Sequence, residues 1–190
     1  MRAELRSHKL TYQDYLQFPE DGRRHELIDG EHFVTAAPNV KHQTLLALLT
    51  ELLGGFVRRN KLGRVWATPL DVVLSDFDIV QPDLIFLSRE RFQLLTEAHL
   101  RGAPDLAVEV LSPSTRRRDL SDKLRLYERS GVTEYWVVDP EEDTVEVYRQ
   151  NEGGYRLEAR LSVEQGDTLS SPLFPGWALA LEELFHPLSG

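Results

Sequence analysis

The chain has 190 residues, 41% of them hydrophobic and 28% charged, which fits one soluble domain and excludes an intrinsically disordered chain. It contains no cysteine, which excludes disulfide scaffolds and thiolate metal sites, and its first ten residues carry no apolar signal segment, so we expect a cytoplasmic protein. The formal net charge of -9 argues against a general affinity for nucleic acid, although six basic residues stand against three acidic ones between 112 and 131.

The N-terminal part predicts a helix, a hairpin and a second helix. Residues 11–18 begin with a threonine that suits an N-cap, and they predict a short helix. Residues 25–33 predict two short strands around an Asp-Gly turn. Leucines recur at helical spacing over 42–53, so a helix is predicted there, with Gly54 and Gly55 expected to end it.

The middle of the chain is rich in predicted strands. Short apolar runs at 65–74, 83–87 and 106–111 are bounded by proline or charge. The last two are apolar on both faces, which is typical of strands covered on both sides of a sheet. A helix is predicted over 119–130, because Gly131 suits its end.

The C-terminal part predicts an antiparallel extension. Residues 134–139 predict another buried type of strand, and two alternating strands are predicted between 145 and 161. The longest uncharged stretch, 168–181, is fourteen residues long and contains two prolines, so it predicts no membrane span. The whole pattern predicts an α/β (α+β) fold with a mixed central sheet flanked by helices, in a single domain over 1–190.

Two carboxylates in apolar strands need an explanation. Asp83 follows Pro82 at the start of one strand, and Glu109 lies between valines in another, where a lone ionised carboxylate is costly to bury. A Mg²⁺ ion is commonly held by one or two carboxylates together with substrate phosphate and water. The alternative is that Asp83 caps a strand and Glu109 lies on an exposed edge.

Five segments resemble one known family. They are HELIDGE (25–31), VQPDLIFL (80–87), GAPDLAVEVLSPSTRRRDL (102–120), the K-x3-Y pair Lys123 and Tyr127, and GVTEYWVVDPE (131–141). The chain resembles the Uma2 family (DUF820) of the PD-(D/E)xK superfamily over about 10–185. This resemblance implies a restriction-endonuclease-like core.

The resemblance also implies a set of site residues. Asp83 and Glu109 would be the metal ligands, for Mg²⁺ or Mn²⁺. The signature places a lysine where this chain has Leu111, so Lys123 on the following helix is the candidate for a migrated catalytic lysine. Glu26 matches an N-terminal acid that related folds often add to the site, or else is an exposed strand residue. A solvated Lys123 remains the alternative to its catalytic role.

One histidine and three loop arginines are further polar residues in or near these segments. His42 matches a histidine common in the family, and we expect it to be structural. The loop arginines Arg116, Arg117 and Arg118 would suit phosphate contacts, although an ordinary solvated loop explains them equally well.

The resulting function hypothesis is a Mg²⁺-dependent endonuclease that hydrolyses DNA phosphodiester bonds, acting as a homodimer. The first alternative is a catalytically inactive module of the same fold that binds nucleic acid or protein. The second is an enzyme that acts on another phosphoester or nucleotide, which the acidic C-terminal third would favour.

Overall fold

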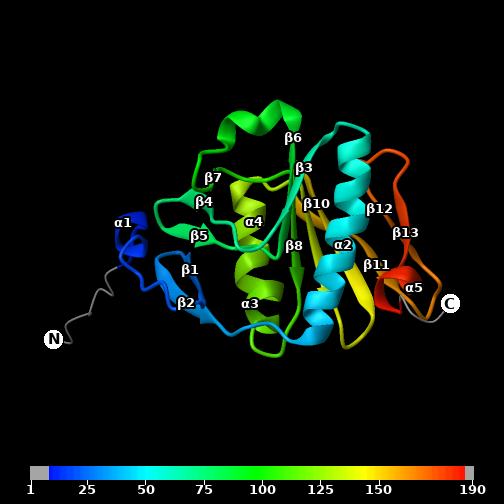
Figure 1. Ribbon diagram of the computed structural model, residues 1–190, viewed down its shortest axis with the longest axis horizontal. Coiled ribbons are helices and arrows are strands. Elements are labelled where there is room, and N and C mark those ends of the chain that lie inside the picture. The colour runs from blue at the N-terminus through cyan, green and yellow to red at the C-terminus, as the bar shows by residue number, and fades with distance from the viewer. Residues whose placement is uncertain (1–8, 187–190) are drawn as a thin grey trace.

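Two sheets form the centre of the molecule in the computed structural model, which describes residues 9–186 (Figure 1). The larger sheet has six strands in the order β11-β10-β9-β8-β6-β3, and the smaller has five in the order β2-β1-β5-β4-β7. The pair β8–β9 is parallel, whereas the other pairs of the larger sheet are antiparallel. The mixed sheet expected from the sequence is therefore confirmed.

The elements follow one another along the chain as helices and short strands. The helices are α1 (Tyr12–Tyr15), α2 (Val40–Arg59), a 3₁₀ helix (Arg89–Leu94), α3 (Arg116–Arg118), α4 (Leu124–Ser130) and α5 (Leu181–Phe185). The strands are β1 (Arg24–Ile28), β2 (Glu31–Thr35), β3 (Gly63–Ala67), β4 (Val72–Ser75), β5 (Asp78–Val80), β6 (Leu84–Ser88), β7 (Leu100–Arg101), β8 (Leu106–Val110), β9 (Glu134–Asp139), β10 (Thr144–Asn151), β11 (Gly154–Ser162), β12 (Thr168–Ser170) and β13 (Ala178–Ala180). Among the described helices, none is both long and apolar enough to cross a bilayer.

The larger sheet is covered on both faces, as its apolar strands predict. On one face α2 and the C-terminal segment pack against the sheet in one core, in which Trp136 and Phe174 are fully buried. On the other face the helical segment 116–130 and the smaller sheet cover the strands, with Tyr127 and Tyr135 fully buried. Figure 1 shows α2 and α4 on opposite sides of β8. A polar side chain on the second face of β8 therefore lies inside the protein.

The predicted end of the leucine-rich helix is wrong. We expected Gly54 and Gly55 to end it, but α2 continues to Arg59. A glycine inside a helix costs about 1 kcal/mol relative to alanine. Leu53 and Val57 are almost fully buried on either side of the two glycines, so the packing of this helix face outweighs the cost.

Two other element boundaries also differ from the prediction. The run 65–74 forms two strands, β3 and β4, interrupted around Pro69, which has no amide hydrogen to donate to a sheet. The helix predicted over 119–130 begins at Arg116 and contains a π-helical turn at Asp119–Lys123. That turn alters the rotation per residue, so an even 100° step does not describe which side chains of this helix are buried.

Candidate active site

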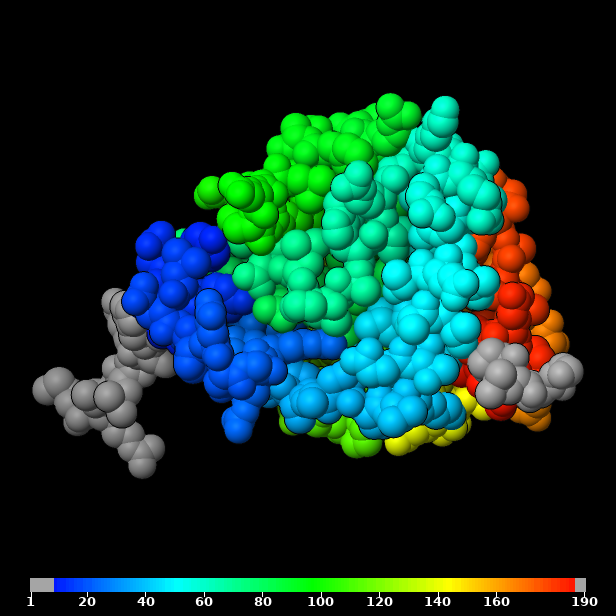
Figure 2. Space-filling view, viewed as in Figure 1, coloured from blue at the N-terminus to red at the C-terminus, as the bar shows by residue number. Residues whose placement is uncertain are grey.

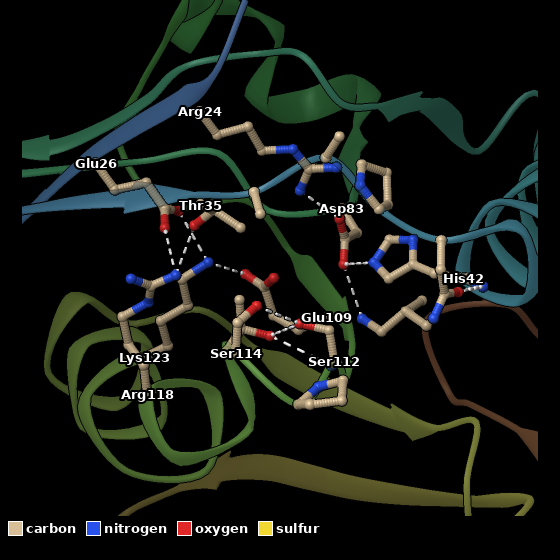
Figure 3. Close-up of a pocket in the computed structure, with 17 residues that line it drawn as sticks. Arg24, Glu26, Thr35, His42, Asp83, Glu109, Ser112, Ser114, Arg118 and Lys123 are labelled. Carbon is tan, nitrogen blue, oxygen red and sulfur yellow. Dashed lines mark hydrogen bonds and ion pairs between the residues drawn. The ribbon is translucent and has the colours of Figure 1, made fainter.

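A pocket of about 200 Å³ opens between the two sheets. Its walls are β1, the end of β2 with the linker 36–39 that joins it to α2, the end of β8, and the loop 112–115. Figure 2 shows the linker on the lower surface of the molecule. Figure 3 shows the charged side chains that point into the pocket from β1, from the end of β8 and from the helix that begins at Arg116. All four residues expected to be catalytic, Glu26, Asp83, Glu109 and Lys123, line it.

Asp83 lies immediately before β6 and is 2% exposed. The register that pairs Leu84 with Val108 places it beside Glu109. Its Oδ2 accepts hydrogen bonds from Nε2 of His42 (3.0 Å) and from the amide of Val110 (2.9 Å), while Oδ1 accepts one from Nη1 of Arg24 (2.5 Å). Burial alone would raise the pKa of Asp83, but the hydrogen bond and charge of His42, with the charge of Arg24, lower it to about 2.

Lys123 lies between two carboxylates that come from different strands. Its Nζ is 2.8 Å from Oε1 of Glu109 on β8 and 2.8 Å from Oε1 of Glu26 on β1 (Figure 3). The Lys123 side chain is 3% exposed, so the alternative of a solvated helix lysine is wrong. Glu109 and Glu26 are also almost fully buried, which excludes the exposed positions considered for both. The signature position 111 holds a leucine and supplies no charge to Glu109, whereas Lys123 contacts this carboxylate from the helix.

Glu109 lies in a strongly acidic environment. Burial raises its pKa well above the ordinary carboxyl range, and Lys123 opposes this shift, whereas Asp119, Asp83 and Glu26 add to it. Burial alone would lower the pKa of Lys123, but Glu109, Glu26 and Asp119 outweigh it and raise that pKa above its usual value. The lysine therefore remains charged, and its one positive charge faces three carboxylates.

Tyr127 adds a neutral donor to the same carboxylate. Its hydroxyl donates a hydrogen bond to Oε1 of Glu109 at 2.8 Å, and the ring is fully buried. Burial raises the pKa of Tyr127 well above its usual value, so the hydroxyl keeps its proton. The K-x3-Y spacing thus brings both side chains to one carboxylate oxygen, although the sequence did not show that Tyr127 contacts the site.

Sequence reasoning did not assign Arg24 or His42 to the site. Both contact Asp83, from β1 and from the first turn of α2 respectively. The spacing offered one signal for Arg24, because residues two apart on a strand share a face and Glu26 was already a candidate. His42 was expected to be structural. It is 5% exposed, and its Nδ1 has no hydrogen-bond partner within residues 9–186.

The three loop arginines have different positions. Arg118 lines the pocket, donates to Oγ1 of Thr35 at 2.6 Å and lies 3.6 Å from Glu26. Arg116 pairs with Asp139 at 2.7 Å, and Arg117 is exposed. Of the three, Arg118 is the one placed against the candidate site.

The donor set fits a hard divalent cation. Across residues 9–186, no group of three or more histidine, aspartate or glutamate side chains is placed to hold a metal ion. Two carboxylates with water and phosphate are sufficient for Mg²⁺, and Asp83 and Glu109 line one pocket. Burial raises the pKa of Glu109, Lys123 opposes this shift, and the neighbouring carboxylates add to it. A further cation at these oxygens would favour the ionised carboxylate.

Comparison with known proteins gives one family and one fold. The chain is 26% identical over 149 residues to "Uncharacterized protein slr1290" of Synechocystis sp., covering 77% of each chain. Its fold matches the crystal structure of "a putative nuclease belonging to DUF820" from Anabaena variabilis, with a TM-score of 0.78 and 22% identity over 93% of this chain and 97% of the other. The Uma2 family model, described as "Putative restriction endonuclease", matches residues 12–182. The resemblance is confirmed: this chain belongs to the Uma2 family and has its nuclease-like fold.

Proposed function

We propose that this protein is a Mg²⁺-dependent endonuclease that hydrolyses phosphodiester bonds of DNA in the pocket between β1 and β8. The observation that carries the proposal is the position of Lys123, whose ammonium group lies 2.8 Å from Glu109 and from Glu26. The nuclease signature pairs its acidic strand residue with a lysine two residues later. Here the helix supplies that charge from a different place in the chain.

Within this proposal, the residues of the pocket have different roles. Asp83 and Glu109 would hold the cation, which when bound polarises the phosphate and lowers the pKa of an attacking water. His42 and the Val110 amide fix the orientation of Asp83, because both donate to Oδ2. Tyr127 and Lys123 hold Oε1 of Glu109 and so leave Oε2 as the oxygen for a ligand.

Lys123 and Glu26 act as a charged pair behind these ligands. The buried ammonium offsets negative charge at Glu109 and, in a preorganised position, also offsets charge that develops on the phosphate during reaction. Glu26 accepts the amide hydrogen of Gln81 at 2.9 Å and so ties β1 to the segment that precedes Asp83. We assign Glu26 the role of holding the lysine in place. Arg118 at the pocket wall would contact a substrate phosphate.

The proposal is tested by cleavage of supercoiled plasmid DNA with Mg²⁺ or Mn²⁺, compared with EDTA, together with a Mn²⁺-soaked crystal. We expect the protein to produce nicked or linear plasmid only when the divalent metal is present and not in EDTA. In the soaked crystal we expect a metal ion bound by Asp83 and Glu109. An absence of cleavage on DNA and RNA alike, with no ion in the crystal, would favour the alternative of a catalytically inactive binding module. Cleavage of free nucleotides or small phosphoesters without cleavage of DNA would favour the other alternative.

A further inference from the structure

The two oxygens of Asp83 have unequal neighbours. Oδ2 is held by the Val110 amide, which belongs to β8, and by His42, which is 5% exposed in the first turn of α2. Neither donor can move away from Oδ2 without a shift of β8 or of α2. Oδ1 is held by Arg24, a long and flexible side chain. A ligand that binds Asp83 must therefore take Oδ1, at the position of the Arg24 guanidinium.

Arg24 is less firmly anchored than the other cations of the pocket. Its side chain is 18% exposed, and its contact with Asp83 is the one side-chain hydrogen bond it makes within residues 9–186. Lys123, by contrast, is 3% exposed and contacts three carboxylates. Arg118 is 12% exposed, donates to Thr35 and lies over the ring of Phe33. Compared with Lys123 and Arg118, Arg24 can therefore move away from its partner Asp83 with the loss of a single ion pair.

We propose that Arg24 is the resident cation of the candidate metal site and that its guanidinium competes with a divalent ion for Oδ1 of Asp83. This inference rests on the proposed function, because it concerns the same carboxylate. Arg24 acts through Asp83 and is therefore a positioning residue. Without metal it compensates the buried carboxylate, and when metal binds, the guanidinium is released into the pocket, where a phosphate oxygen is its natural partner.

If Arg24 competes with the metal, removal of its charge should increase the affinity for the divalent ion. Removal of a structural ion pair normally disorders a site and weakens binding, whereas removal of a competitor strengthens it. The Arg24–Asp83 ion pair is partly buried. We therefore expect its removal to raise the affinity for the divalent ion about tenfold, which is equivalent to about 1.4 kcal/mol of binding free energy. Arg24→Met keeps the apolar stem and deletes the charge, and Arg24→Gln is a second variant in case the methionine does not fold.

The experiment is titration calorimetry of Mn²⁺ into the metal-free protein, without nucleic acid, for the wild type, Arg24→Met and Arg118→Met. Arg118→Met is the matched control, because it removes the same charge from the same pocket without touching Asp83. We expect Arg24→Met to bind Mn²⁺ about tenfold more tightly than the wild type, and Arg118→Met to stay within about threefold. Circular dichroism spectra and melting temperatures verify that each variant is folded.

Each other result overturns the inference. If Mn²⁺ binds the wild type, but Arg24→Met and Arg24→Gln bind it equally or less tightly, the competition is refuted while the proposed metal site stands. An equal gain in Arg24→Met and Arg118→Met would show a general effect of charge and refute the specific contact. If none of the proteins binds Mn²⁺, the proposed function fails together with this inference.

Discussion

At the scale of single residues, the candidate site is a set of charges held inside the protein. Glu26, Asp83, Glu109 and Lys123 are each at most 3% exposed. A buried charge is stable only with a partner, so every substitution here alters both the chemistry and the free energy of folding. Experiments on these residues therefore need a separate measurement of stability.

The proposed metal ligands give the first prediction. Asp83→Ala and Glu109→Ala should each abolish Mn²⁺ binding in titration calorimetry, because each removes one of the two carboxylates that would hold the ion. Asp105→Ala is the control. Asp105 follows Pro104 as Asp83 follows Pro82, but it does not line the pocket. It accepts hydrogen bonds from the Ser88 amide and from Arg91, so this variant should bind Mn²⁺ normally. Unchanged affinity in both ligand variants would remove the metal-site assignment.

Lys123 gives the second prediction. Lys123→Met should lower Mn²⁺-dependent plasmid cleavage about 10²–10³-fold, since one preorganised charge is lost. It should also reduce the free energy of unfolding at pH 7 by about 3 kcal/mol, because Glu26 and Glu109 lose their buried partner. Urea unfolding and a plasmid-nicking assay measure the two effects.

The control for Lys123 lies on the same helical segment. Arg125 is exposed and pairs with Asp122, so Arg125→Met should change stability by at most about 0.5 kcal/mol and leave cleavage unchanged. Full activity of a folded Lys123→Met protein would refute the migrated-lysine assignment.

Asp83 gives a prediction about pH. Its pKa is about 2 in the folded protein and 3.8 ordinarily, so its ionised form stabilises the fold above pH 4 and that contribution disappears as the pH falls toward 2. The contribution is on the order of 2 kcal/mol. The difference in unfolding free energy between the wild type and Asp83→Asn should therefore shrink between pH 5 and pH 2.5, as measured by urea titrations. A difference that stays constant with pH would contradict the ion pairs of Asp83.

At the scale of elements, long-range packing decides where helices end. Buried leucines carry α2 past two glycines, and a π-helical turn places Lys123 inside the molecule. Leu120 and Leu124 on the same helical segment are only partly buried. The position of the site thus depends on an irregularity of the helix.

The glycines of α2 give the fourth prediction. A Cβ at Gly54 would lie 3.8 Å from Cβ of Val65, an ordinary contact, so Gly54→Ala should increase the unfolding free energy by about 0.5–1 kcal/mol. At Gly63 a Cβ would collide with the backbone oxygen of Leu87, so Gly63→Ala should be destabilising. Urea unfolding of the two variants should give shifts of opposite sign. Destabilisation by Gly54→Ala would mean that α2 needs a glycine at that position.

At the scale of the whole molecule, the two sheets share one pocket between them. β1 of the smaller sheet contributes Arg24 and Glu26, and β8 of the larger sheet contributes Glu109. No single segment of residues 9–186 contributes all of these side chains. The same arrangement leaves β11 as an outermost strand of the larger sheet, with Leu157 exposed on it.

The last prediction concerns association. We expect a homodimer, because nucleases of this fold commonly pair to cut both strands and the β10–β11 hairpin offers a surface for pairing. Light scattering at micromolar concentration should give twice the chain mass of 21.8 kDa. Leu157→Glu should then shift the protein toward monomer, since a charge at the contact is unfavourable. A monomeric mass for the wild type would refute the expectation.

The sequence by itself determined much of the local structure. The N-cap threonine of α1, the hairpin of β1 and β2, and the doubly covered strands β6, β8 and β9 all depend on neighbouring residues or on simple alternation. The family motifs also pointed to Asp83, Glu109, Lys123 and Glu26, which the structure brings to one pocket.

Only the tertiary structure decided how those residues are paired. Arg24 and Asp83 are 59 positions apart, and His42 and Asp83 are 41 apart, so no local pattern relates them. The burial of Lys123 depended on a π-helical turn and on the arrival of β1 from a second sheet. Periodicity reports which face of an element is apolar, whereas the pairing of charges depends on which elements meet and in what register.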